Sequence, residues 1–241
     1  MNKNKIKRNV VLGILFFLPV TFLLFMYPAK HNYIALDIIE EQVLDIEFFT
    51  SFDEDKNIIL KDHITILGFL GNQPKEKLTA MSNLKELMYD KFKGFKKFQI
   101  VMVVPDTAKN DVQQLKSELS KHEYLKYWYY VFGSDNEIKQ LYNNLNLIAD
   151  LDANLASNNV VIIDKDLNLR GRLDDRTDNQ KQMEKPVYQL KSYDCIEVAE
   201  IKNKMSEDLR IVFTEYRQKR KGNFDSTTRR ASDLIDDNEQ D

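Results

Sequence analysis

Residues 64–90, ITILGFLGNQPKEKLTAMSNLKELMYD, join an apolar run, a Gly-Asn-Gln-Pro turn and a segment with helical periodicity. The run from Ile64 to Leu70 is short, β-branched and continuously apolar, which is typical of a strand buried on both faces of a sheet. Pro74 suits a first helical residue, because that position needs no backbone N–H. Apolar residues follow at helical spacing, at Leu78, Met81, Leu84, Leu87, Met88 and Phe92. The turn is therefore predicted to lie between a strand and a helix N-terminus, where open α/β sheets place ligands and reactive groups.

The composition limits the classes of protein that the chain can represent. Its 241 residues are 43% apolar and 30% charged, which predicts one folded domain with appendages. Four basic residues lie within residues 3–8, and without them 31 basic and 38 acidic residues give the rest a charge of −7. A mildly acidic body argues against binding of nucleic acid. Cys195 is the only cysteine, so no intramolecular disulfide can form, and no standard zinc spacing occurs.

The N-terminal segment predicts a membrane anchor. Residues 1–9 are basic and expected to be cytoplasmic, and residues 10–27 carry no charge over 18 residues, which span about 27 Å as a helix. A cleaved signal peptide is one alternative, but residues 27–30 offer a poor cleavage site. A soluble helix is another, against which stand Pro19 and the missing polar face. Because positive charges stay inside, the expected location is a bacterial inner membrane, single-pass, with the C-terminal domain facing the periplasm.

The remaining pattern predicts an α/β body. Residues 28–47 are assigned to a linker and a first strand that includes Leu36 and Ile38, and a second strand is expected across Val43–Phe49. Residues 48–220 form the predicted domain, and residues 221–241 a disordered tail. Within the domain, the predicted elements are strands at 98–104 and 128–132, helices at 106–121 and 134–145, a β-hairpin at 160–163 and 169–173, and a terminal helix from 198 to 216.

This order of elements is that of the thioredoxin fold, and the chain resembles the Sco (SenC) family of membrane-anchored copper chaperones. The resemblance covers residues 48–175. It rests on Phe69-Leu70, Met81, Asp106-Thr107, Leu115, Trp128, Phe132-Gly133, Ile138, Val161-Ile162-Ile163-Asp164 and Arg170-Gly171. The final strand, followed by Asp and then Arg-Gly, is the most specific shared feature.

The chain departs from this family where the family carries its chemistry. Sco proteins have a C-x-x-x-C pair in the turn, and here Gly71, Asn72, Gln73, Pro74 and Lys75 fill that window. The position of the family's copper-binding histidine falls near Asn158 or Asn159. Thiolates hold Cu(I), and thiol redox chemistry needs an attacking and a resolving sulfur. We therefore expect no catalysis, no metal and no cofactor.

Other residues that could carry chemistry have ordinary structural interpretations. Cys195 and the methionines at 81, 88 and 102 are expected to pack in the core. His63 is expected in a loop at the far end of the first long strand from the turn. The aspartates at 164, 166, 174 and 175 do not follow a calcium-loop pattern.

The resemblance implies a protein that acts by binding, in biogenesis of a respiratory copper oxidase, with an oxidase subunit or assembly factor as partner. The candidate protein-interaction residues are Gly71, Asn72, Gln73, Pro74 and Lys75, with a loop at Asn158-Asn159 expected across from them. A metal-independent envelope sensor or structural protein is one alternative. A thiol oxidoreductase that uses Cys195 is a second.

Overall fold

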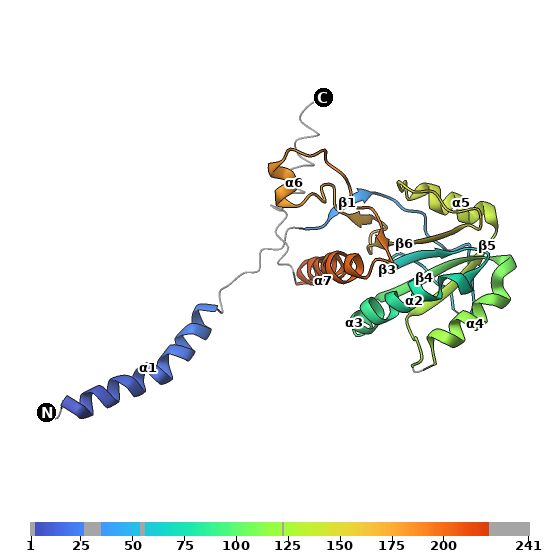
Figure 1. Cartoon of the computed structure of the whole chain (residues 1–241). Helices are drawn as coiled ribbons and strands as arrows, with labels where there is room; N and C mark the ends of the chain where they lie inside the picture. Colours follow the sequence, from blue (N-terminus) through green and yellow to red (C-terminus); the bar gives the residue numbers. More distant parts are fainter. Residues whose placement is uncertain (1–2, 27–34, 54–55, 122, 222–241) are drawn as a thin grey trace. The chain divides into compact units, whose positions relative to one another are not determined.

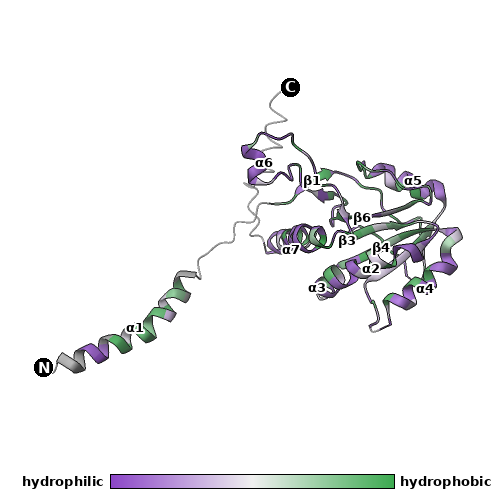
Figure 2. Cartoon of the chain, viewed as in Figure 1, coloured by the Kyte–Doolittle hydropathy of each residue, from purple (hydrophilic) through white to green (hydrophobic). Residues whose placement is uncertain are grey.

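The computed structural model describes residues 3–26, 35–53, 56–121 and 123–221, in two units, Met1–Ile34 and Ala35–Asp241. Residues 28–34 of the predicted linker and first strand (28–47), and residues 222–241 of the predicted tail (221–241), lie outside the described residues. In the first unit, helix α1 (Lys3–Met26) has 24 residues, with Pro19 inside it. Apolar residues line most of it (Figure 2), and the side chains of Leu15, Phe16 and Phe17 are among those that are exposed. Within the described ranges, none of the helices combines the length and apolar character that crossing a bilayer requires.

The second unit, which we call the body, is built around one mixed sheet (Figure 1). Its strands run in the order β1-β7-β6-β3-β4-β5-β2, and β8 pairs with β6. They are β1 (Asp37–Glu40), β2 (Thr50–Ser51), β3 (Ile64–Leu70), β4 (Phe98–Pro105), β5 (Trp128–Gly133), β6 (Ala156–Ile163), β7 (Leu169–Gly171) and β8 (Tyr193–Asp194). Strands β3, β4 and β5 are parallel neighbours, whereas β6 runs antiparallel to β3.

Helices cover both faces of the sheet (Figure 1). The helices of the body are α2 (Leu78–Leu84), α3 (Asp90–Phe92), α4 (Lys109–Leu119), α5 (Asp135–Asn144), α6 (Asp178–Gln182) and α7 (Ser206–Arg220), of which α6 buries no residue. Tighter or wider helical segments adjoin them at η1 (Pro74–Lys77), η2 (Lys85–Tyr89), η3 (Asp106–Ala108) and η4 (Glu200–Met205). Helices α2, α4 and α7 share one hydrophobic cluster, and α5 packs in a second one.

The predicted strands of the sheet centre are confirmed, and their alternation explains the two clusters. Every residue of β3 and β4 is buried. In β4, Ile100 and Met102 face the cluster under α2 and α4, whereas Val101 and Val103 face the cluster under α5. Because both faces are covered, a continuous apolar run is what such strands need.

Helix α5 begins where the sequence predicts it. The Ser134 side chain accepts from the Glu137 N–H, and the Glu137 carboxylate accepts from the Ser134 N–H at 2.7 Å, which completes the capping box. Ile138, Leu141 and Tyr142 are buried beneath this helix, as their spacing predicts.

Two strand predictions are wrong. Residues 43–49 form no strand: Val43 and Ile46 are buried from an irregular segment, and Phe48 is 86% exposed. The Val43 N–H donates to the Leu167 carbonyl, but the N–H groups of Leu44 and Ile46 donate to the side chains of Asn144 and Asp45, so the apolar spacing reflects packing rather than a strand ladder. The second hairpin strand ends at Gly171, two residues early, and Leu173 is exposed.

The hairpin of β6 and β7 is joined to the terminal helix by buried charges. The Arg170 guanidinium is fully buried and donates to Asp164 at 2.8 Å, to the Leu36 carbonyl at 2.6 Å, and to Glu215 of α7. Burial alone would raise the pKa of Asp164, but hydrogen bonds from Arg170 and Asn168 lower it below its usual value. The Asp and Arg of the family-like motif therefore form a structural ion pair that fixes β7 against α7.

Candidate functional site

The turn at Gly71–Lys75 lies where the sequence places it, between the C-terminal end of β3 and the start of η1. Gly71 has a φ of +65°, and a Cβ there would lie 2.3 Å from the Asn154 carbonyl oxygen, so this turn requires glycine. The Asn72 N–H donates to that same oxygen at 2.8 Å. The turn is thus held against the segment that precedes β6.

The polar side chains of the turn are engaged with neighbouring helical segments. Asn72 accepts a hydrogen bond of 2.8 Å from the Thr107 hydroxyl, at the start of the α4 region. Lys75 lies 3.0 Å from the Asp111 carboxylate, with both side chains 49% exposed. Gln73 is exposed and Pro74 is buried. The turn therefore presents amide and ammonium groups in a fixed arrangement.

An open pocket adjoins the turn, between η1 and α4. It has a volume of about 330 Å³ and is lined by Lys75, Leu78, Gln114, Leu115, Ser117 and Glu118. Leu78, which the helical spacing assigns to the core, is 37% exposed at its rim. An apolar floor with polar edges is typical of a surface that receives a side chain of another molecule.

The predicted loop at Asn158-Asn159 is wrong, because both residues lie within β6. Asn158 still lies near the site, since its side-chain oxygen accepts a 2.9 Å hydrogen bond from Lys77. Asn159 instead pairs with Asp194 of β8, and its amide donates to Ser192 at 3.0 Å. The structure brings Asn158 toward the turn and takes Asn159 away from it.

The residues that do face the turn are Asn154 and Ala156. Asp152 accepts hydrogen bonds from the backbone N–H groups of both, at 2.8 and 2.9 Å, and so shapes this loop. The sequence analysis did not predict this role of Asp152, although an aspartate two residues before an asparagine is a recognisable turn signal.

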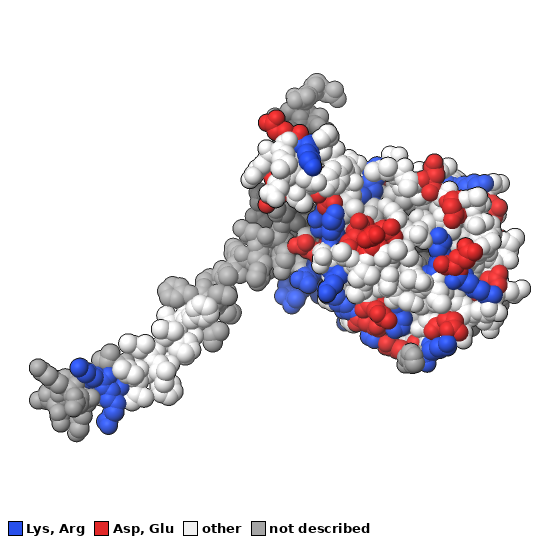
Figure 3. Space-filling view, in the orientation of Figure 1, with Lys and Arg blue, Asp and Glu red and all other residues white. Residues whose placement is uncertain are grey.

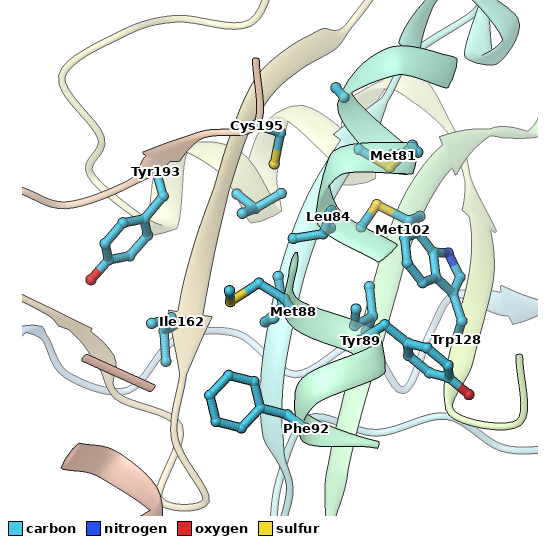
Figure 4. Packing of buried hydrophobic residues seen from close by; sticks show 14 of the residues in the cluster. Met81, Leu84, Met88, Tyr89, Phe92, Met102, Trp128, Ile162, Tyr193 and Cys195 are labelled. Carbon is cyan, nitrogen blue, oxygen red and sulfur yellow. The ribbon is translucent and has the colours of Figure 1, made fainter. Parts of the chain in front are cut away.

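Cys195 is completely buried in the cluster that also holds Met81, Met88 and Met102 (Figure 4). Burial raises the pKa of its thiol well above the usual range, and the charges of Asp194 and Glu200 add to that rise. The reactive thiolate form is therefore disfavoured at neutral pH.

Because Cys195 is buried, its thiol is expected to react slowly with reagents in solution. In the native protein, Cys195 should react with a water-soluble disulfide reagent about 100-fold more slowly than in urea-unfolded protein, because reaction needs opening of the core. Absorbance of the released thiolate reports both rates. Equal rates would contradict the buried assignment and would favour the oxidoreductase alternative.

His63 lies immediately before β3, at the opposite end from the turn. Its Nδ1 is 2.9 Å from the Lys61 carbonyl oxygen, and burial lowers the pKa of its imidazole.

Among residues 3–26, 35–53, 56–121 and 123–221, no three His, Cys, Asp or Glu side chains are grouped as a metal site needs. On the face shown in Figure 3, acidic and basic residues of the body are interspersed.

No protein-family model matches the chain, and no curated protein does. Among solved structures, BsSco, a member of the Sco family of cytochrome c oxidase assembly proteins, is similar at a TM-score of 0.53 and 14% identity, over 76% of this chain and 99% of BsSco. The soluble domain of Sco1 from Bacillus subtilis has a TM-score of 0.46 and 12% identity, over 76% and 95%. A proposed protein disulfide isomerase from Bacteroides thetaiotaomicron has a TM-score of 0.48 and 13% identity, over 77% and 98%.

The agreement with BsSco covers nearly all of that protein, at an identity that establishes the fold alone. It accords with the element order predicted from the sequence. The chain therefore has a Sco-like thioredoxin fold.

Proposed function

We propose that this protein is a non-catalytic member of the Sco-like group that acts by binding other proteins, in biogenesis of a respiratory copper oxidase. The observation that carries the proposal is the turn at Gly71–Lys75. It keeps the place of a reactive turn at the end of β3, but its polar side chains are amides and an ammonium: Asn72 accepts a hydrogen bond from Thr107, and Lys75 forms an ion pair with Asp111. Such groups suit recognition of a protein surface, and neither thiolate nor imidazole is present there.

The proposed location is a bacterial inner membrane, with residues 10–27 as a single-pass anchor and the body facing the periplasm. Two features support it: the 18 uncharged residues of that segment, whose last residue is not among the described ones, and the basic residues before it.

The binding surface can be tested by replacing the turn amides. In the Asn72→Ala, Gln73→Ala double variant, we expect recovery of oxidase subunits with the affinity-tagged full chain from detergent-solubilised membranes to fall about tenfold. Mass spectrometry of the captured proteins measures this. The matched control is Asn136→Ala with Gln140→Ala, which removes two exposed amides from α5, on the other face of the sheet. Unchanged recovery in the turn variant would show that this face is not the site.

The absence of metal chemistry has its own test. Titration of the purified full chain with Cu(I) under a competing chelator should give no stoichiometric, tight binding, because the turn offers no soft ligand. Binding of one equivalent at low concentration would contradict the non-metal proposal.

The sensor alternative makes a different prediction for cells. Deletion of the protein should lower oxidase activity and copper content of the membranes if it acts in assembly. If it is a metal-independent sensor or structural protein, both should stay unchanged.

A further inference from the structure

The chain makes an excursion between β7 and β8, residues 172–191, which we call the arm. Arg172 and Leu190 exchange two backbone hydrogen bonds of 2.9 Å at its base. The backbone N–H of Asp175 donates to the Tyr188 carbonyl at 3.0 Å. Beyond this paired base the arm carries the short helix α6, which stands out from the sheet on the side of β1 (Figure 1). No residue of α6 is buried, and Leu190 at the base of the arm packs against the hydrophobic cluster under α2, α4 and α7.

Polar contacts give the arm a defined shape. Arg176 donates to the Asp174 carboxylate at 2.9 Å and to the Lys185 carbonyl at 2.6 Å, which ties the two sides of the arm together. The hydrogen bond from Arg176 lowers the pKa of Asp174 to about 2. Thr177 and Gln180 form a capping box, and the Tyr188 hydroxyl lies 3.1 Å from the Gln180 side chain.

The same arm holds apolar side chains out in solvent. Met183 is 70% exposed, Val187 59% and Tyr188 43%, and Leu173 at the base is 41% exposed. Apolar side chains gain free energy when they leave water, and here the body leaves these four exposed. A polar scaffold that presents apolar residues is the arrangement of a contact surface.

The base of the arm lies beside the point where the chain enters the body. Leu173 donates its N–H to the Asp37 carboxylate at 3.0 Å, and Asp37 is the first residue of β1, so the base of the arm lies where the chain enters the body. Residues 27–34 separate the end of α1 from the body, and such a segment reaches at most about 30 Å. An anchored segment 10–27 would thus keep this edge of the sheet close to the bilayer.

We propose that the arm is a lipid-contact element, with Met183 and Val187 inserted at the headgroup boundary of the membrane. This inference rests on the membrane attachment proposed above. Insertion of exposed apolar side chains to about 5–10 Å is the mode of interfacial segments. Tyr188 would place its ring at the same level with its hydroxyl in water, and the exposed Lys181 and Lys185 would reach the phosphates.

A fluorescent label on the full chain tests the arm. In a Cys195→Ala background, Met183→Cys is labelled with an environment-sensitive dye, and the protein is reconstituted into vesicles of phosphatidylcholine and phosphatidylglycerol. The matched control is Tyr124→Cys, a position that is 67% exposed just before β5, toward the other edge of the sheet from β1. We expect the label at 183 to be at least about twofold brighter than at 124, and to be quenched by nitroxide-labelled lipid.

The possible outcomes separate the arm from the anchor. If alkaline carbonate leaves the protein in the vesicles but the labels at 183 and 124 behave alike, the arm proposal is overturned and the anchor stands. If carbonate releases the protein and both labels stay dim, the attachment fails and the arm proposal with it. If the label at 183 is shielded from iodide only in native membranes, and lipid nitroxides do not quench it, a protein covers the arm and the lipid assignment is wrong.

Discussion

Replacing Arg170 by methionine is expected to lower the free energy of unfolding by about 3–5 kcal/mol. The guanidinium is fully buried between Asp164 and Glu215, which are 1% and 4% exposed. Methionine fills much of the volume but removes the cation shared by Asp164 and Glu215, and the partly exposed Lys219 remains as a partner of Glu215 at 3.0 Å. Urea unfolding followed by the fluorescence of Trp128, the single tryptophan, measures the loss. Arg176→Met is the matched control, because its pair with Asp174 lies at the surface, and the urea midpoint should hardly move.

The dependence on pH gives a second readout of the same variant. Although burial opposes ionisation, Arg170 holds the pKa values of Asp164 and Glu215 below their usual ranges. Depressed values mean that the stabilisation is complete above about pH 4 and is lost as the pH falls through the folded-state pKa values. The variant lacks this contribution at neutral pH. The gap between wild type and Arg170→Met should therefore narrow from pH 7 to pH 3, and a constant gap would refute the assignment.

Replacing Gly71 by alanine is expected to cost about 2–4 kcal/mol of stability and to displace the turn. Two effects add. Alanine is strained at a φ of +65°, and its Cβ would lie 2.3 Å from the Asn154 carbonyl oxygen and 2.8 Å from the Ala156 nitrogen. Both neighbours are backbone atoms, so neither can move aside without disturbing β6. The displaced turn should also lose partner binding, as in the Asn72 and Gln73 variants.

Urea unfolding measures the stability of the Gly71→Ala variant, and Gly94→Ala is its control. A Cβ at Gly94 meets nothing within 4 Å, so this change should stay within about 0.5 kcal/mol of wild type. A Gly71→Ala variant as stable as Gly94→Ala would mean that the turn is not pressed against Asn154 as described.

Periodicity predicted the centre of this fold because burial there is two-sided and regular. The apolar runs at β3, β4 and β5 are typical of buried strands, and the capping box located the start of α5. The same signal failed at residues 43–49, where Val43 and Ile46 are buried singly from irregular backbone. In residues 43–49 the spacing of apolar residues indicates which side chains are buried. It does not indicate whether a neighbouring strand is present to form hydrogen bonds.

Of the two segments that form the candidate site, the turn at residues 71–75 was predictable from the sequence, and the segment that faces it was not. The turn follows from local residues, since a buried strand, Gly71 and Pro74 determine it. Its opposite wall depends on how β6 registers against β3, where a shift between Gly68 and Leu70 brings Ala156 opposite Leu70. That tertiary detail put Asn154 at the turn and turned Asn159 toward β8. The helix and the paired base of the arm were not predicted, because polar contacts shape this segment and its sequence has no hydrophobic periodicity.

The buried ion pair of Arg170 also governs when the body can fold. Its guanidinium joins the Leu36 carbonyl, 134 residues earlier in the chain, to Glu215, 45 residues later. During synthesis, the hairpin that carries both Asp164 and Arg170 emerges well before the helix that carries Glu215. Until that helix is made, the buried guanidinium has one of its two carboxylate partners, so stable closure of the body waits for the last helix. For a body on the far side of a membrane, as proposed above, such late closure would leave the chain open for threading through a translocation channel.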